Sequence, residues 1–330
     1  MKYLIKLVLL LIITTVLYSQ EVPQMRIEDR IRIAEAYSLN NELADSIWQN
    51  WSKTTFSTLL VTSDYEFLVY NNNPSSDFKL AGFDSLLMSP VYYRPRQMDE
   101  NFLATYPAVN GIPTIVVGTP EKTNKTSGEW VITLLHEHFH QLQMSHNDYY
   151  DAVNKLNLSG GDESGMWMLN YPFPYDSTGI NTAFNELSRN LLDAINSVDN
   201  EDFHAKAMGY YEMRKNFTNM LKEADYKYFS FQLWQEGIAR YTELMIARLA
   251  AEKRTPSSGM HNLSDFFSYK ETSQKIISGI VKNLQELTLT SYKRVAFYSL
   301  GSGEALILDK LNPEWKEKYF INKFYLEKYF

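Results

Sequence analysis

The chain has 330 residues, of which 45% are hydrophobic, so it is long enough for one large domain or two small ones with a substantial core. It has no cysteine, which excludes disulfides, thiolate metal ligands, a cysteine nucleophile and a lipid-modified N-terminal cysteine. The formal charge is −7 and no block of lysine or arginine occurs, which argues against nucleic acid as a partner.

The first 19 residues have the pattern of a secretory signal peptide. Lys2 and Lys6 precede the apolar run Leu7–Leu17, which is too short for an ordinary membrane span. Ser19 suits a cleavage site, but the leucine two places earlier does not, so retention as a membrane anchor is the alternative. We therefore expect an exported protein of bacterial type, periplasmic or secreted, with membrane contact only if the segment is retained. Cleavage would change the formal charge from −7 to −9, because it removes two lysines and no acids.

The part of the chain before residue 129 mixes predicted helices and strands. Apolar periodicity predicts helices at 26–39 and 43–51, and β-rich runs predict strands within 56–70 and at 112–117. Residues 77–110 have no clear pattern, and we expect mostly loop there, with a short helix around 83–88.

A helix over about 129–146 carries the sequence HExxH, formed by His136, Glu137 and His140. At about 100° per residue, the two outer histidines fall on one face roughly one turn apart and can reach a single zinc ion. Glu137 lies beside them, where it can accept a proton from a water molecule at the metal. His138 points the other way. The alternative is an ordinary core helix, which has little use for three unpaired imidazoles and a carboxylate.

The rest of the chain is irregular at first and then almost wholly helical. Residues 147–179 are rich in Gly, Asn, Asp, Pro and aromatic residues, and in an enzyme they are a candidate rim or lid. Helices are predicted at 181–197, 201–224, 228–252, 272–288 and 293–311.

A zinc site with two histidines needs a third protein ligand. The best candidate is Glu236, because it lies in an apolar helix where a buried carboxylate requires a cation or a metal. Gly237 and Ala239 beside it would let a second helix approach closely. The next choices are Glu163, Asp162 and His204. We expect the remaining histidines not to be ligands: His138, His146, His204 and His261.

HExxH followed by Trp234-x-Glu236-Gly237-x-Ala239-x-Tyr241 resembles the gluzincin branch of zinc metallopeptidases. The resemblance implies one zinc ion held by His136, His140 and Glu236, with Glu137 as general base. It also implies a zincin-like α+β fold, predominantly helical, with a small N-terminal β-containing part. We expect a single catalytic domain over 20–330, built from an α/β part at about 20–128, the metal helix at 129–146 and a helical part at about 180–330.

Some features depart from the gluzincin pattern. The gap of 96 residues between His140 and Glu236 is longer than in thermolysin-like members. Those members have an acid four residues past the ligand glutamate that steadies a histidine, and here that position is Arg240. Glu243, on the same helical face as Glu236, could serve instead. The Gly-x-Met-Glu-Asn motif of the related aminopeptidases is missing, so aminopeptidase activity is not implied.

Two tyrosines lie close to these motifs in the sequence or in the expected site. Several gluzincin families have a Tyr-x-x-Gly element similar to Tyr298 and Gly301, whose phenol lies over the metal and could hydrogen-bond an oxyanion. Tyr298 is therefore a candidate catalytic residue, with a packed aromatic as the alternative. Tyr241 lies about 140° round its helix from Glu236, so we expect a structural role for it.

The sequence thus predicts a zinc-dependent metallopeptidase acting on a peptide or protein substrate. In such an enzyme, the strand at 112–117 could pair with an extended substrate, although an ordinary core strand is the alternative. Other functions left open are a zinc hydrolase of non-peptide amides or esters and a non-catalytic envelope protein that keeps the zincin fold for binding.

Overall fold

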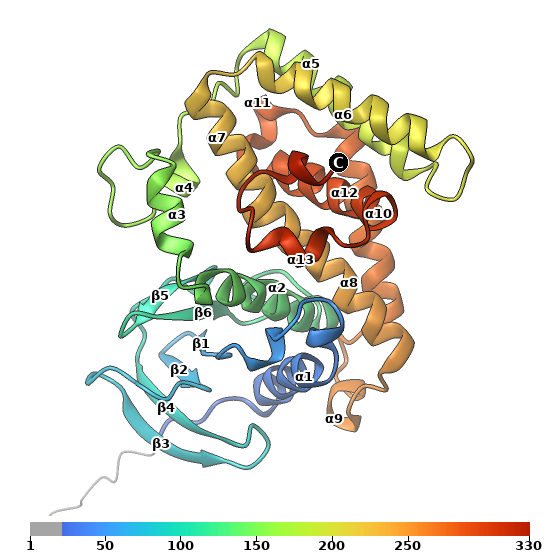
Figure 1. The fold of residues 1–330 in the computed structure, drawn as a ribbon. Coiled ribbons are helices and arrows are strands. Elements are labelled where there is room, and N and C mark those ends of the chain that lie inside the picture. Colours follow the sequence, from blue (N-terminus) through green and yellow to red (C-terminus); the bar gives the residue numbers. More distant parts are fainter. Residues whose placement is uncertain (1–21) are drawn as a thin grey trace, which may run out of the picture.

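The computed structural model describes residues 22–330, so the predicted signal peptide lies outside the described residues. The chain folds into a mixed α/β structure, with a sheet-bearing part below and a helical part above it in Figure 1. Between residues 22 and 330, no helix combines the length and the apolar character needed to cross a membrane.

Six strands form one sheet in the order β3-β4-β2-β1-β6-β5. Strands β1 and β6 run parallel, and the other neighbouring pairs are antiparallel. The strands are β1 (Thr58–Val61), β2 (Tyr65–Val69), β3 (Lys79–Asp84), β4 (Ser89–Pro95), β5 (Leu103–Val109) and β6 (Ile112–Gly118).

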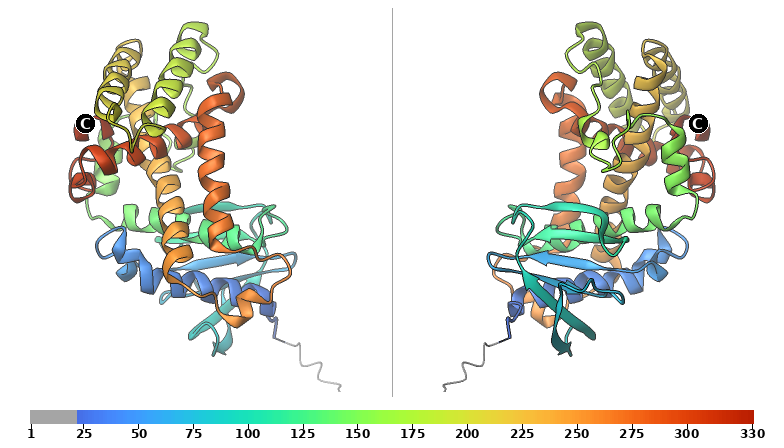
Figure 2. Two further views of the ribbon diagram at one scale, coloured as in Figure 1. Left: turned by 90° about the vertical axis from the view of Figure 1, so that its right-hand side faces the viewer. Right: turned by 90° about the vertical axis from the view of Figure 1, so that its left-hand side faces the viewer.

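The helices are α1 (Ile27–Leu43), α2 (Ser127–Ser145), α3 (Tyr149–Lys155), α4 (Trp167–Asn170), α5 (Thr178–Ile195), α6 (Phe203–Asn219), α7 (Glu223–Gln232), α8 (Ile238–Lys253), α9 (Ser258–His261), α10 (Tyr269–Glu286), α11 (Leu289–Tyr292), α12 (Ala296–Leu311) and α13 (Trp315–Tyr319). A π-helical turn, Leu233–Gly237, joins α7 to α8 in one continuous rod. Short 3₁₀ turns cover Ala44–Ser46, Trp51–Lys53, Lys293–Val295 and Leu326–Tyr329. Figure 2 shows α8 and α10 running side by side from the sheet-bearing part into the helical part.

Helix α2 connects the two parts. It begins at a capping box, in which Thr126 and Glu129 bond to each other's backbone N–H groups, satisfying donors that a helix start leaves open. One side packs on β5 and β6 and another on α8, so 16 of its 19 residues are buried. The apolar cluster around it extends from Met25 to Tyr329. The HExxH residues are therefore held in the core of the molecule.

Most predicted helices are confirmed, with ends that differ by a few residues. The helices expected at 181–197, 201–224, 272–288 and 293–311 correspond to α5, α6, α10 and α12, and that at 228–252 falls on the α7–α8 rod. The helix expected at 43–51 is wrong. That segment holds a 3₁₀ turn and Asn50 with φ of 63°, a left-handed conformation that a continuing helix cannot contain. Residues 147–179 include the short helices α3 and α4.

The prediction for residues 77–110 is also wrong. In place of loop and a short helix at 83–88, the segment forms a hairpin of β3 and β4 and then strand β5. Strand β3 lies at the sheet edge, and Leu80 and Phe83 are 60% and 67% exposed. Such a strand lacks the alternation of buried and exposed residues by which strands are recognised.

The predicted strand at 112–117 is present as β6, but it cannot pair with a substrate. It lies between β1 and β5, so both of its hydrogen-bonding edges are occupied. The alternative, an ordinary core strand, is confirmed. The edge strand beside α2 is β5.

Candidate metal centre

The side chains of His136 and His140, on α2, converge with that of Glu236, on the π-helical turn between α7 and α8. Nε2 of His140 lies 3.5 Å from Oε2 of Glu236, and Nε2 of His136 lies 3.8 Å from the same oxygen. The ligating atoms of the three residues lie within 4.8 Å of one another. Zinc with bonds of about 2.0–2.1 Å to tetrahedral ligands places those ligand atoms about 3.4 Å apart. The group can therefore hold a metal ion with little rearrangement.

Glu236 is carried by the π-helical turn Leu233–Gly237. Such a turn inserts an extra residue into a helix and often occurs at functional sites. It is covered by α12, where the two backbones meet at glycines: a Cβ on Gly237 would lie 2.6 Å from Cα of Gly301. The close approach that the sequence suggested for Gly237 is thus present, and it brings the start of α12 next to Glu236.

The other nitrogen of each histidine has its own polar partner. Nδ1 of His136 lies 3.4 Å from Oε2 of Glu243, and each oxygen of that carboxylate accepts a hydrogen bond from Nη1 of Arg240. Nδ1 of His140 lies 2.7 Å from Oε1 of Gln143. The oxygen atoms of Glu243 and Gln143 favour a proton on Nδ1, which leaves Nε2 free to bind a metal. Glu243 therefore occupies the supporting position suggested for it from the sequence.

The charges around the two histidines suit a cation. Burial would lower the pKa of His136, but the carboxylates of Glu236 and Glu243 outweigh burial and raise it to about 10. The pKa of Glu236 lies well below its usual value, because the two histidines outweigh its burial. Glu137 is a third carboxylate whose negative charge acts on His136. Without a metal, a proton on His136 compensates part of this negative charge, and a divalent ion could replace it.

Glu137 is oriented from the edge of the sheet. The Thr105 hydroxyl, on β5, lies 2.8 Å from Oε2 of Glu137 and 3.0 Å from its backbone oxygen. The Glu137 carboxylate is thus hydrogen-bonded to the edge strand β5, and it is next to His136 in the chain. This placement is consistent with a base that acts on a water molecule beside the three ligands.

Tyr298 lies in the first turn of α12, near Glu236. Burial first, and then the negative charge of Glu236, raise the pKa of its phenol well above 10, so the phenol is neutral at ordinary pH. Its oxygen accepts a hydrogen bond from Nη1 of Arg294. The same nitrogen lies 3.9 Å from Oε1 of Glu236. The site therefore has a phenol and a guanidinium on the α12 side.

The other residues weighed as ligands lie elsewhere. Glu163 and His204 are exposed, and Asp162 accepts hydrogen bonds from its own loop. His138 faces away, toward Trp51 and Phe56, and burial lowers its pKa to about 4. His146 stacks on Phe320, His261 is exposed, and the Tyr241 hydroxyl donates to Asp309.

Four polar residues of the site were missed in the sequence: Thr105, Gln143, Gln235 and Arg294. Gln143 is three residues after His140, so its helical spacing could have revealed it. Arg294 is four residues before Tyr298, so helical spacing could have revealed it in the same way. Thr105 and Gln235, whose Nε2 lies 3.1 Å from Nδ1 of His140, approach through tertiary packing and left no such pattern.

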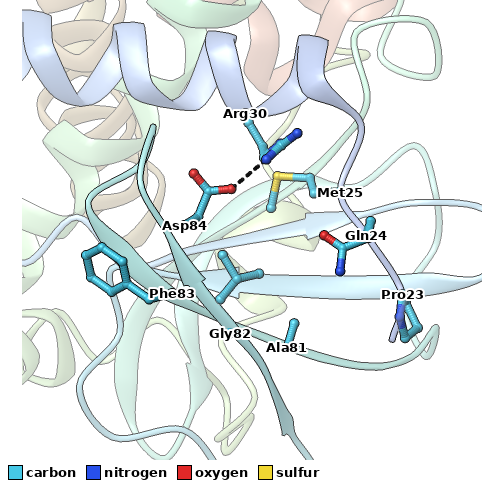
Figure 3. Close-up of a pocket in the computed structure, with 9 residues that line it drawn as sticks. Pro23, Gln24, Met25, Arg30, Ala81, Gly82, Phe83 and Asp84 are labelled. Atoms are coloured by element: carbon cyan, nitrogen blue, oxygen red, sulfur yellow. Dashed lines mark hydrogen bonds and ion pairs between the residues drawn. The ribbon is translucent and has the colours of Figure 1, made fainter. Parts of the chain in front are cut away.

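A hollow of about 200 Å³ lies far from this group, between the start of the described chain and the β3–β4 hairpin (Figure 3). Its ionic side chains are Arg30 and Asp84, which pair at 2.9 Å. They neutralise each other, so nothing there indicates catalysis or metal binding.

Comparison of the chain with protein-family models, with curated proteins and with solved structures finds no match.

Proposed function

We propose that the protein is a zinc-dependent metallopeptidase with a zincin-like fold, similar to gluzincins, and that it acts outside the cytoplasm. The observation that carries the proposal is the convergence of His136, His140 and Glu236, with Glu137 next to the first ligand. The pattern of Lys2, Lys6 and the apolar run after them supports export to the periplasm or the medium.

Zinc suits this donor set better than magnesium or calcium, because two of the three ligands are imidazoles. A zinc ion bound here would polarise a carbonyl group and lower the pKa of a water molecule.

The chain's own residues then have distinct roles. Glu137 accepts the proton of the attacking water and passes it to the leaving amine. Thr105 holds that carboxylate in position. Tyr298 offers a hydroxyl to the negative oxygen that develops on the carbonyl.

A peptide could approach along β5. This strand is the edge of the sheet, and its Thr105 contacts Glu137, so a segment paired with β5 would pass beside the base. A peptide substrate is thus favoured over a small ester, since backbone pairing needs an extended chain.

The first test is zinc content, measured by elemental analysis on wild type, His140→Ala and Glu236→Ala. We expect one equivalent in wild type and a large loss in both variants. Absence of zinc from wild type, even after metal is added, would contradict the proposal.

The second test is Glu137→Gln, which should keep its zinc and lose about 10²- to 10⁴-fold in rate. Peptide, ester and non-peptide amide substrates should be compared in the same assay. Turnover of esters alone would indicate another zinc hydrolase, and zinc without any turnover would indicate a binding protein.

A further inference from the structure

We propose that Arg294 and Tyr298 together form an anion site beside the three metal ligands, in which Arg294 is a positioning residue that directs the phenol proton toward the reacting oxyanion. The inference rests on the proposed function, and it adds a residue that the HExxH and Glu236 motifs do not include.

The direction of one hydrogen bond carries the proposal. A guanidinium has only donors, so in its bond with Tyr298 the phenol oxygen is the acceptor. The O–H of Tyr298 must therefore donate to something else. Glu236 lies on the same side, because its Oε1 is 3.9 Å from the Arg294 nitrogen that donates to the phenol. With Arg294 at the phenol oxygen, the phenol proton is left for an acceptor beside Glu236, as a donor to an oxyanion requires.

Arg294 also brings a positive charge to the site. A metal ion bound to Glu236 would leave this charge without a full counter-charge. Its side chain is 23% exposed, and among residues 22–330 the carboxylate within 4.0 Å of it belongs to Glu236, at 3.9 Å. Once Glu236 donates to a metal ion, its negative charge is shared with that ion. The guanidinium then favours another anion at the same place.

The surroundings of Arg294 do not offset this charge. Tyr228 and Tyr175 lie close enough to interact with it, and burial raises the pKa of both phenols, so both stay neutral. Their rings pack around Phe297.

The backbone before Arg294 is strained. Lys293 has φ of 48° and ψ of −132°, a conformation that side chains with a Cβ rarely adopt. Strain of this kind often occurs at functional sites. Here it begins the 3₁₀ turn Lys293–Val295, which leads into α12 and puts Arg294 one helical turn before Tyr298.

The test uses inorganic phosphate as a tetrahedral anion and the full-length, zinc-loaded protein. Zinc affinity is measured first by competition with a chelator, and phosphate affinity then by calorimetry. The variants are Arg294→Gln, Tyr298→Phe and the double variant. Arg248→Gln is the control, because it removes the same charge from a half-exposed position on α8 that takes no part in the site.

We expect zinc affinity to change less than about threefold in every variant. Phosphate affinity should fall about tenfold or more in Arg294→Gln and Tyr298→Phe, and the double variant should lose little beyond the worse single variant, because the two side chains act as a unit. Arg294→Lys should recover part of the affinity, since it keeps a charged donor.

Phosphate affinity in Arg294→Gln equal to that in Arg248→Gln would overturn the inference and leave the zinc site intact. Failure of wild type to bind zinc would instead overturn the proposed function and the inference with it. If a peptide substrate is found, Arg294→Gln should lower kcat with little change in KM.

Discussion

Nδ1 of His140 lies 2.7 Å from Oε1 of Gln143, three residues further along α2. The amide nitrogen of Gln143 faces the phenol oxygen of Tyr319 at 2.8 Å and the backbone oxygen of Trp234 at 3.3 Å. These acceptors fix the amide so that its oxygen faces the imidazole. Helix α13 thus helps to position a candidate metal ligand, although its Tyr319 lies 179 residues after His140 in the chain.

Gln143→Leu should therefore weaken zinc binding. Without the amide, His140 loses the partner that fixes its tautomer, and such losses cost about 10- to 100-fold in metal affinity. Competition with a chelator measures the effect.

Gln141→Leu is a matched control for that variant. Gln141 faces His138 on the same helix with the same spacing and the same distance of 2.7 Å, but His138 points away from the metal group. This variant should lower stability and leave zinc affinity unchanged. Equal zinc affinity in both variants would contradict the supporting role of Gln143.

Gly237→Ala should destabilise the fold. The new Cβ would lie 2.6 Å from Cα of Gly301, so the π-helical turn and α12 must separate, at a cost of about 1–3 kcal/mol or more. Denaturant unfolding measures this change. Gly209→Ala, in α6, is the control, because its Cβ meets nothing within 4 Å and should stabilise the helix by up to about 1 kcal/mol. Equal stability of the two variants would rule out a tight glycine contact.

Removal of zinc should lower the melting temperature. An ion present at 100 times its dissociation constant stabilises the folded state by about 2.7 kcal/mol, which corresponds to about 5 °C for a chain of this size. The measurement is thermal unfolding with zinc and with a chelator. Glu236→Ala should show no such difference, and a wild type that melts equally in both conditions would contradict a specific site.

Glu121 should make stability depend on pH. Partial burial alone would raise its pKa, but hydrogen bonds from Arg26 outweigh burial and lower it from 4.5 to about 2. Because the folded-state pKa is depressed, the stabilising contribution is complete above about pH 4.5 and is lost as the pH falls toward 2.

Unfolding free energies of wild type and Glu121→Gln, measured from pH 7 to pH 2.5, should therefore converge at low pH. The gap should be small and should shrink in high salt, because the pair is largely exposed. Glu28→Gln is the control, because Glu28 is an exposed acid in the first turn of α1, close to Arg26 in the chain. A gap that stays constant with pH would exclude the ion pair as its cause.

The sequence was most informative where local pattern decides structure. HExxH lies on a long apolar run, so both the helix and the common face of His136 and His140 followed from the 3.6-residue period. Glu236 was found because a lone carboxylate among apolar residues needs a compensating charge.

The parts that could not be predicted depend on distant contacts. Strand β3 forms by pairing with β4 and not by burying one face, so its side chains show no alternation. Thr105 reaches Glu137 from a strand 32 residues earlier in the chain. No local pattern records that contact, because it arises only when β5 packs beside α2.

The π-helical turn at Leu233–Gly237 sets the angle about the helix axis at which the side chains of α8 follow those of α7. A single residue more or less turns everything beyond it by about 100°. Tyr228 and Phe229 on one side, and Tyr241 and Leu244 on the other, are all fully buried. Deleting one residue between them would turn one of these sets out of the core, so the length of the chain at Glu236 is fixed by packing on both sides, independently of any metal.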